Sequence, residues 1–251
     1  MNDLLSASAR NDCGRHDTAL QALGLRTQSS DGIWRCREDG GGIFLSAMTL
    51  RPGIDSSAVG MVLADLVARR SPPVVVRDSF SDLDLTPFGM EMAPPEPWYA
   101  RAAGPPPDDP IPADFAIRSV VSEDSLDIWH GVEWAGFEMA PRVEPIYPAR
   151  LLNEPRFYYF LGLFQDEPAA VATAFVDRDV VGIYDVATLP AMRGRGFASA
   201  LTQQALSLAP LRPATLQPSE MAEAMYRRLG FTEIGRFRLW ISAGHSIGNK
   251  S

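Results

Sequence analysis

Cysteine is scarce in this sequence, which contains only Cys13 and Cys36 among its 251 residues. Neither cysteine has another cysteine or a histidine at the spacing of a zinc finger. This pattern excludes a scaffold built on disulfides or structural zinc. We therefore expect free thiols in a reducing compartment and no metal site.

Long hydrophobic runs are also missing. The longest apolar stretches, such as Phe157–Phe164, have the length of a strand and are too short to span a bilayer. The first residues, MNDLLSASARND, show neither the basic start nor the apolar run of a signal peptide. We therefore expect a cytoplasmic protein that does not bind or cross a membrane.

Positive charge is in deficit, since 23 lysines and arginines face 31 aspartates and glutamates, for a formal net charge of −8. An acidic surface repels phosphate backbones, so we expect no nucleic-acid binding. Cationic or amine-bearing ligands suit such a surface better. Apolar residues make up 46% of the chain, which is enough for a packed core in one large or two small domains.

One segment, AAGPPPDDPIPADF at residues 102–115, is rich in proline and aspartate. Proline has a fixed backbone angle and no N–H to donate, so this composition cannot form a helix or a central strand. We interpret residues 102–114 as an extended, semi-rigid linker. The chain then divides into a first domain of residues 1–101, a second domain of residues 115–242 and a polar, flexible tail, residues 243–251.

The first half combines helical and strand patterns. Helices are expected near Asp17–Ala22 and over residues 54–70, where apolar residues recur every three to four positions before Pro72. Two strands flank the Gly40–Gly42 turn, and a buried strand follows at PVVVRDSF. Two further strands flank the proline-rich break at 94–95.

The second half repeats this order more clearly. Ser122 can cap a helix that runs to about Phe137, and Gly230 can close a later helix that Ser219 caps. Strands are expected at 115–121, on both sides of Asp166, at 181–189, at 214–217 and at 231–242, with a helix at 196–209. The segment 141–153 is irregular, with room for a short helix.

The stretch LPAMRGRGFASAL places a glycine-rich bend, Arg193–Ala198, between a strand and a helix. It is not a dinucleotide fingerprint, because Ser199 occupies the third glycine position, and it lacks the Gly-Lys-Ser/Thr of a P-loop. A helix N-terminus presents unpaired N–H groups, and glycine lets a phosphate approach the backbone closely. The bend predicts either a cradle for a diphosphate, with added charge from Arg193 and Arg195, or a tight turn with solvated arginines.

Two motifs occur in a fixed order in this half. The first, Arg193–Ala198, has the form Arg/Gln-x-x-Gly-x-Gly/Ala, and the second, Tyr226–Phe231, has the form Tyr-x-x-x-Gly-Phe at a helix end. Together they resemble the GNAT superfamily of acetyl-CoA-dependent N-acetyltransferases over residues 115–242. Residues 1–101 resemble the degenerate N-terminal half of bacterial two-domain members of that superfamily.

The resemblance implies an α/β (α+β) fold of two domains, each a mixed twisted sheet flanked by helices. In the second domain, the strands at 181–189 and 214–217 would lie parallel and splay apart. The freed strand edge would pair with the pantetheine amides of acetyl-CoA, and the bend would hold its diphosphate. The implied coenzyme A ligands are Val186, Ala187, Thr188, Arg193, Gly194, Arg195, Gly196, Phe197, Ala198 and Ser199.

Acyl transfer to an amine needs a proton acceptor and a proton donor. A lysine-like amine has a pKa of about 10.4 and must lose a proton before it can attack a thioester. Many members of the family carry a glutamate in this strand region; here the nearby acid is Asp185, with Glu133 and Glu138 as alternatives. Tyr226 matches the family's general-acid tyrosine, whose phenol would protonate the leaving thiolate.

The acceptor is expected to lie near Trp129, Glu133 and Phe137, because aromatic rings beside acids suit a cationic or aromatic amine. Ordinary core packing is the other interpretation of these residues, and His130 is expected to be a structural or surface histidine rather than a base. We predict transfer of an acetyl group from acetyl-CoA to a primary amine of a small molecule or protein, by direct attack in a ternary complex. The alternatives are a non-catalytic acyl-CoA-binding regulatory module and an interaction protein. In each case we expect the protein to be a monomer or a homodimer.

Overall fold

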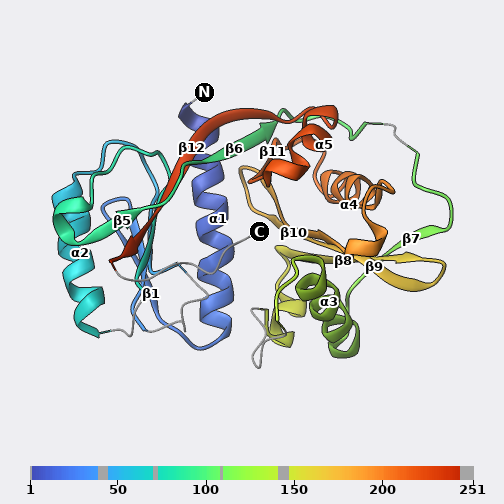
Figure 1. Cartoon of the computed structure of the whole chain (residues 1–251), viewed down its shortest axis with the longest axis horizontal. Coiled ribbons are helices and arrows are strands. Elements are labelled where there is room, and N and C mark those ends of the chain that lie inside the picture. The colour runs from blue at the N-terminus through green and yellow to red at the C-terminus, as the bar shows by residue number, and fades with distance from the viewer. Residues whose placement is uncertain (1, 39–44, 70–72, 108–109, 141–146, 244–251) are drawn as a thin grey trace. The chain divides into compact units, whose positions relative to one another are not determined.

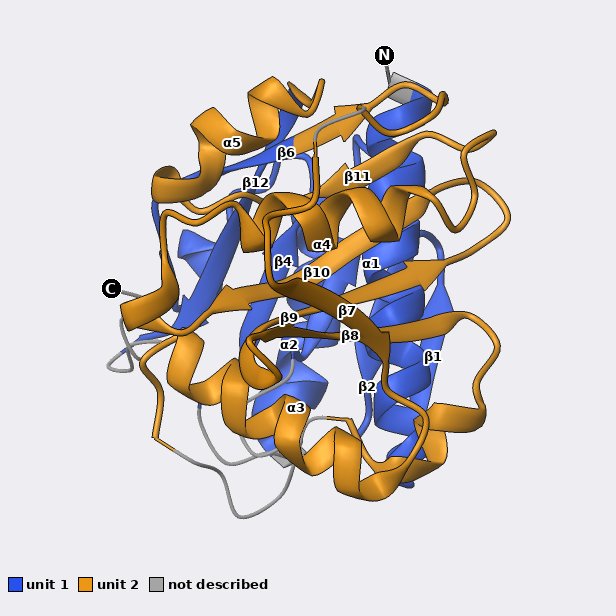
Figure 2. Cartoon of the chain, turned by 90° about the vertical axis from the view of Figure 1, so that its right-hand side faces the viewer, with its two compact units in different colours: residues 1–98, 233–251 blue, residues 99–232 orange. Residues whose placement is uncertain are grey.

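The computed structural model describes residues 2–38, 45–69, 73–107, 110–140 and 147–243. The chain forms two compact units, residues 1–98 with 233–251 and residues 99–232 (Figure 2). Helices and strands alternate in both units (Figure 1), in agreement with the expected α/β class. The predicted Gly40–Gly42 turn and the tail from residue 244 lie outside the described residues.

The first unit is a mixed sheet with two helices. Its elements are α1 (Asn2–Ala22), β1 (Thr27–Ser30), β2 (Ile33–Cys36), β3 (Ala47–Thr49), α2 (Ser56–Arg69), β4 (Val75–Asp78), β5 (Met90–Met92) and β12 (Thr232–Ser242). The strand order is β1-β2-β3-β4-β12, and β5 also pairs with β12. Strands β3 and β4, which α2 connects, are parallel, whereas β12 is antiparallel to β4.

Helix α1 is much longer than the helix expected near Asp17–Ala22. Its buried face mixes polar and small apolar residues, because Ser8, Asn11 and Asp12 are fully buried beside residues such as Ala9 and Ala19. The apolar periodicity that would have revealed the helix is therefore interrupted. The buried Asp12 carboxylate forms an ion pair with Arg77 of β4, which satisfies both charges inside the unit.

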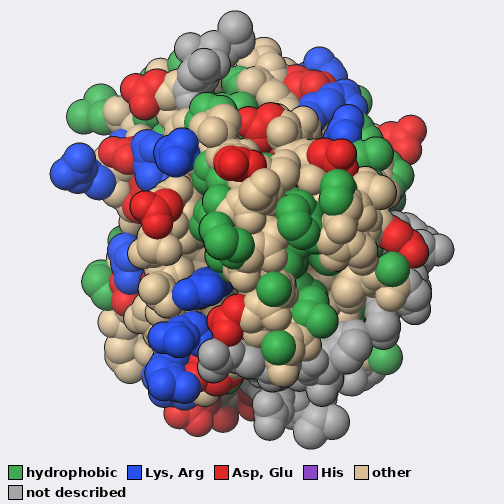
Figure 3. All heavy atoms as spheres, turned by 90° about the vertical axis from the view of Figure 1, so that its left-hand side faces the viewer, with side chains coloured by type: hydrophobic (Ala, Val, Ile, Leu, Met, Phe, Trp, Pro, Cys, Tyr) green, Lys and Arg blue, Asp and Glu red, His purple; other side chains and the backbone are tan. Residues whose placement is uncertain are grey.

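The outer surface of α2 carries apolar side chains. Met61 and Val67 of this helix are 72% and 55% exposed, and Phe88 is 40% exposed. A groove of about 310 Å³ lies between Phe88 and the helix residues Leu63 and Val67. Figure 3 faces this side of the unit and shows apolar side chains gathered near its middle, with charged side chains around them.

The second unit is a mixed sheet covered by helices on both faces. Its elements are the end of β6 (Glu96–Arg101), β7 (Phe115–Ser119), α3 (Glu123–Gly136), β8 (Phe157–Phe164), β9 (Glu167–Val176), β10 (Val181–Thr188), α4 (Phe197–Leu206), β11 (Ala214–Leu216) and α5 (Glu223–Arg228). The strand order is β6-β11-β10-β9-β8-β7. Helices α3 and α4 lie on opposite faces of this sheet (Figure 1). The parallel pair β10–β11, connected by α4, repeats the topology of β3 and β4.

Two strands pair with segments from the other half of the sequence. They are β6, the last strand of the first half, and β12, the last strand of the second half. From Tyr99 onward β6 pairs with β11 of the second unit, and β12 pairs with β4 and β5 of the first. Residues 231–242 were expected in the second domain, whereas residues 233–242 belong to the first compact unit. The alternation of side chains in this segment indicates a strand but carries no information about its partner.

None of the described helices is long and apolar enough to cross a membrane.

Candidate functional site

Strands β10 and β11 run together only briefly. They pair at Val181↔Ala214 and Gly182↔Thr215, and β10 then continues to Thr188. Its opposite edge stays paired with β9 as far as Thr188↔Ala170. Among the described residues, Val186–Thr188 therefore have no strand partner on the side of β11, as the expected splay of the two parallel strands requires.

A β-bulge interrupts β10 at the point where the strands part. The register with β9 shifts between Tyr184 and Ala187, and Asp185 has a φ of 53°. Aspartate is among the few residues that adopt this left-handed conformation, and a bulge redirects the side chains next to it. The half-buried Asp185 carboxylate accepts a hydrogen bond of 2.7 Å from the Tyr147 hydroxyl. The predicted base is thus held by a defined donor.

A buried chain of contacts continues from Tyr147 into α3. The Nε2 atom of His130 lies 3.1 Å from the Tyr147 carbonyl oxygen, and its Nδ1 atom lies 3.5 Å from Glu133 Oε2. A carbonyl can only accept, so Nε2 must carry a proton, and a hydrogen bond to Glu133 needs a second proton on Nδ1 or on the carboxyl group. His130 and Glu133 are each only 2% exposed. Glu133 is therefore part of the buried interior of the unit in this structure, and His130 is structural, as expected.

The other residues expected at the acceptor site differ in exposure. Trp129 is completely buried, and its indole N–H donates to the Ala172 carbonyl at 3.4 Å. Its ring also packs edge-on against Tyr147 and Tyr159, so it fills the core between α3 and the sheet. Phe137, at the C-terminal end of α3, is 42% exposed. Of the three residues predicted for acceptor binding, Phe137 alone is on the surface.

The glycine-rich bend is open to solvent. Gly194 and Gly196 have φ angles of 78° and 84°, which are strained for residues with a side chain. A Cβ atom at Gly194 would meet nothing within 4 Å, and one at Gly196 would meet only Pro112, at 3.4 Å. Gly196 is the N-cap of α4, and no described group accepts a hydrogen bond from the amides of residues 194–199. This arrangement fits a bound diphosphate.

The side chains of the bend have other partners. Arg193 donates to the Gly136 carbonyl at 2.8 Å and pairs with Glu138 Oε1 at 2.9 Å. The Arg195 guanidinium lies over the ring of Phe164, 5.1 Å from its centre. The buried ring of Phe197 stacks on Phe115 at 4.1 Å. Both arginines thus have contacts within the unit, whereas the main-chain amides of residues 194–199 are open to an anion.

Glu138 follows the end of α3 in an uncommon conformation. Its φ is 56°, and its amide and that of Met139 donate to the carbonyls of Ala135 and Trp134. This is the Schellman closure of a helix, in which the left-handed position is usually glycine. A side chain there costs about 1–2 kcal/mol, and an exposed ion pair returns about 0–1 kcal/mol. Arg193 also donates to the Gly136 carbonyl, so its guanidinium contacts this helix end at two points.

Tyr226 lies inside the unit at the expected place. Gly230 closes α5, as predicted, with a φ of 86° and hydrogen bonds from its amide to Arg227 O and from Phe231 N to Tyr226 O. The Tyr226 side chain is 5% exposed and packs in the core between α4 and α5. Burial raises the pKa of its phenol, and an interaction with Thr202 acts in the opposite direction. The phenol is thus protonated at neutral pH, as a proton donor must be.

One local expectation was wrong. Ser219 does not cap α5: it precedes a 3₁₀ turn, Glu220–Ala222, and its side chain makes no capping hydrogen bond. Helix α5 begins only at Glu223, because the 3₁₀ turn takes up the first residues of the expected helix. Ser122, in contrast, caps α3 through a capping box with Ser125, as expected.

Two residues at the site were missed from the sequence. Tyr147 lies in the irregular segment before β8, where no periodicity marks it. Gln217 directly follows β11, and its side-chain nitrogen is buried without a hydrogen-bond partner in the described part of the chain. The only signal for Gln217 in the sequence is that a polar residue follows a short apolar strand.

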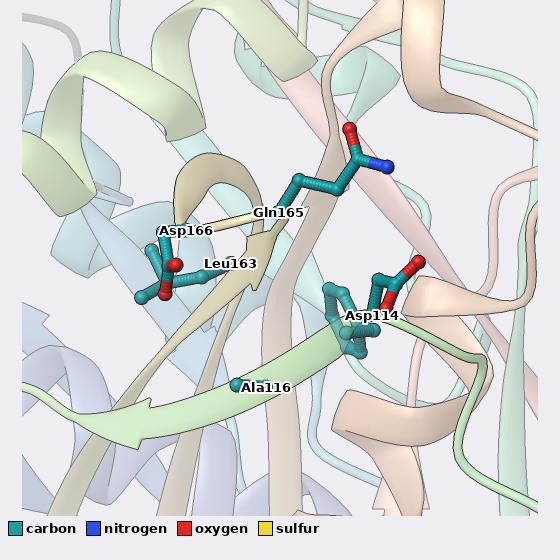
Figure 4. Close-up of a pocket in the computed structure, with 6 residues that line it drawn as sticks. Asp114, Ala116, Leu163, Gln165 and Asp166 are labelled. Atoms are coloured by element: carbon teal, nitrogen blue, oxygen red, sulfur yellow. The ribbon is translucent and has the colours of Figure 1, made fainter.

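A hollow on the surface of the second unit lies elsewhere. It measures about 450 Å³ and is lined by Asp114, Phe115, Ala116, Leu163, Gln165 and Asp166 (Figure 4). None of the predicted site residues lines it. The carboxylates of Asp114 and Asp166 do not converge in Figure 4, and no group of described residues could hold a metal ion.

Comparisons with known proteins assign the family. Residues 124–231 match the family model described as "Acetyltransferase (GNAT) family". The matched segment contains the bulge of β10, the bend and α5. The second unit therefore carries a GNAT acetyltransferase domain, and the general chemistry of that family is acyl transfer.

Solved structures share the fold over nearly the whole chain. A GCN5-related N-acetyltransferase from Kribbella flavida has 20% identity and a TM-score of 0.67, over 95% of this chain and 96% of its own. A GCN5-related N-acetyltransferase from Sphaerobacter thermophilus has 16% identity and a TM-score of 0.62, over 86% and 79%. A functionally unknown conserved protein from Staphylococcus epidermidis has 10% identity and a TM-score of 0.61, over 89% and 96%. No curated protein matched the sequence significantly.

Proposed function

We propose that the protein transfers an acetyl group from acetyl-CoA to a primary amine of a small molecule or a protein. The observation that carries this proposal is the open bend at residues 193–198, in which the amides of residues 194–198 have no partner among the described residues. The bend directly follows the strand edge that parts from β11. Neither cysteine forms a disulfide in the described part of the chain, in keeping with a cytoplasmic enzyme.

The binding role falls to the main chain. The amides of residues 194–199 bind the diphosphate, and the N-terminus of α4 adds the equivalent of about half a positive charge. The free edge of Val186–Thr188 hydrogen-bonds to the pantetheine amides in the manner of an added strand. Acetyl-CoA, when bound, supplies the thioester carbonyl that the amine attacks.

The side chains handle the protons. Asp185 takes the proton that the ammonium group must lose, while Tyr147 orients its carboxylate. Tyr226 donates its phenol proton to the sulfur that leaves. Holding the two reactants together is the larger contribution, since fixed proximity is worth about 7–11 kcal/mol of the barrier.

A non-catalytic acyl-CoA-binding module is the second candidate. It is favoured by the burial of Tyr226, which is 5% exposed in this structure. Because burial raises the pKa of the phenol, donation of its proton is less favourable than from an exposed tyrosine. The two candidates share the nucleotide site and differ in whether any amine is acetylated.

Calorimetry with coenzyme A and a thiol-release assay with a panel of amines test the proposal. We expect heat on binding, thiol release with at least one amine, and a loss of about 10²-fold or more in kcat for Tyr226→Phe, with unchanged coenzyme A affinity. Binding without turnover for any amine would select the binding module. Absence of binding heat would refute both candidates.

A further inference from the structure

The first arginine of the bend is bound to the end of a different helix. Arg193 leads the motif, and its guanidinium contacts the Gly136 carbonyl and the Glu138 carboxylate at the C-terminus of α3. A helix C-terminus carries partial negative charge, so a cation there is stabilising. The side chain thus connects the nucleotide bend to α3 within the second unit.

The helix end that Arg193 contacts depends on few interactions. Glu138 holds a left-handed conformation at a position where glycine is usual, and Arg193 is its ion-pair partner. Both side chains are partly exposed, at 36% for Arg193 and 54% for Glu138. The ion pair and the bond to the Gly136 carbonyl are thus direct contacts between the bend and the last turn of α3.

The same turn of α3 lies against the strand that leads into the bend. A Cβ atom on Gly136 would come within 2.8 Å of the Ala187 Cβ and 3.2 Å of the Thr188 nitrogen. The exposed Phe137, expected to contact the acceptor, follows directly. The nucleotide edge of β10 and the acceptor side of α3 therefore meet at Gly136.

We propose that Arg193 is a positioning residue for acetyl transfer: its guanidinium fixes the C-terminal turn of α3, and with it the acceptor side of the site, when the bend binds a diphosphate. This inference rests on the proposed function, because it assumes that coenzyme A occupies the bend. It assigns Arg193 to acceptor positioning and leaves diphosphate binding to the main chain.

The chain offers a charge-matched comparison. Arg195 lies in the same bend but stacks over Phe164, and no described contact joins it to α3. Arg193→Gln and Arg195→Gln each remove one positive charge from the bend. Both variants should therefore attract anions less strongly to the same degree. Only Arg193→Gln also removes the contacts with the C-terminal turn of α3.

Hydrogen–deuterium exchange with coenzyme A as the probe tests the inference. In the wild type and in Arg195→Gln, saturating coenzyme A should slow exchange of the amides of residues 194–199 and also of residues 137–139. We expect the second effect to be about fivefold or more, the lower range of coupling between two sites. In Arg193→Gln the amides of 194–199 should still slow while those of 137–139 do not, and Arg193→Lys should restore part of the effect.

Steady-state kinetics give a second readout for any amine that is turned over. Arg193→Gln should raise the KM for the amine or lower kcat by about tenfold, with a change below about threefold in coenzyme A affinity. Arg195→Gln should not reproduce that pattern. Circular dichroism of each variant separates these effects from loss of folding.

The outcomes are distinguishable. If coenzyme A protects no amide of 194–199 in the wild type, the proposed function itself is refuted. If it protects them but leaves 137–139 unchanged, or if Arg193→Gln keeps the protection of 137–139, the positioning role is wrong. A large loss of coenzyme A affinity in Arg193→Gln but not in Arg195→Gln would place the guanidinium on the phosphates instead and overturn the inference.

Discussion

At the scale of single residues, Asp185 combines a left-handed backbone conformation with a hydrogen-bonded carboxylate. Its φ of 53° costs about 1–2 kcal/mol for a residue with a Cβ atom. Such strain persists only where the surroundings hold it, and it concentrates at functional sites. The Tyr147 hydroxyl, at 2.7 Å, is the side-chain donor that holds the carboxylate.

Tyr147→Phe removes this donor and keeps the ring. A hydrogen bond to a charged group is worth about 1.5–3 kcal/mol, so a misplaced Asp185 should lower kcat/KM for the amine by about tenfold or more. The affinity for coenzyme A, measured by calorimetry, should not change. Tyr159→Phe, in the same aromatic cluster, is the control and should leave the kinetics near those of the wild type. Wild-type kinetics in Tyr147→Phe would argue against Asp185 as the base.

At the scale of elements, the approach of α3 to β10 is set by one glycine. Gly136 packs against Ala187 and Thr188 so closely that a methyl group there would overlap with them. Gly131, on the same helix, is exposed and has open space around its Cα. Close packing therefore requires a glycine at position 136, whereas a side chain would fit at position 131.

Gly136→Ala and Gly131→Ala should change stability in opposite directions. The first overpacks the contact between α3 and β10 and should lower the free energy of unfolding by about 1–3 kcal/mol. The second should raise it by about 0.5–1 kcal/mol, because alanine favours the helix interior. Urea denaturation of both variants measures the difference, and equal effects would contradict the packing described for α3.

At the scale of the whole molecule, the response to acid depends on a buried charge cluster in the first unit. Asp12 pairs with Arg77 of β4 and with Arg15 of its own helix, and His16 lies beside it. Burial would raise the pKa of Asp12, but Arg77, His16 and Arg15 outweigh burial and hold that pKa well below its usual range. Burial and Arg15 lower the pKa of His16, with Asp12 opposing them.

Both shifts make the protein less stable in acid. The unfolded chain protonates His16 near pH 6.5 and Asp12 near pH 3.9, in each case before the folded protein does. The contribution of His16 is thus complete above about pH 6.5 and is lost as the pH falls toward its folded pKa; that of Asp12 is lost at still lower pH. His16→Gln should flatten the decline in unfolding free energy between about pH 7 and 5, measured by urea titration. An unchanged slope would show that His16 does not contribute.

The sequence predicted local features well, because their causes are local. The cap at Ser122, the closure of α5 at Gly230 and the bend at 193–198 depend on residues a few positions apart. The partner of residues 233–242 and the bond from Tyr147 to Asp185 depend on segments far apart in the chain, which no periodicity reports. Helix α1 was mostly missed because polar residues interrupt its buried face, among them Asp12, whose partner Arg77 lies 65 positions away.

The crossing of β6 and β12 into opposite sheets has a consequence for biosynthesis. Strand β4 cannot acquire its neighbour β12 until residues 233–242 have left the ribosome, so the sheet of the first unit stays incomplete while residues 99–232 are synthesised. During that interval the edge of β4 and the apolar residues that later pack with Trp240 are exposed to chaperones and to other nascent chains. A gene split between the two halves would yield fragments that need each other to mature.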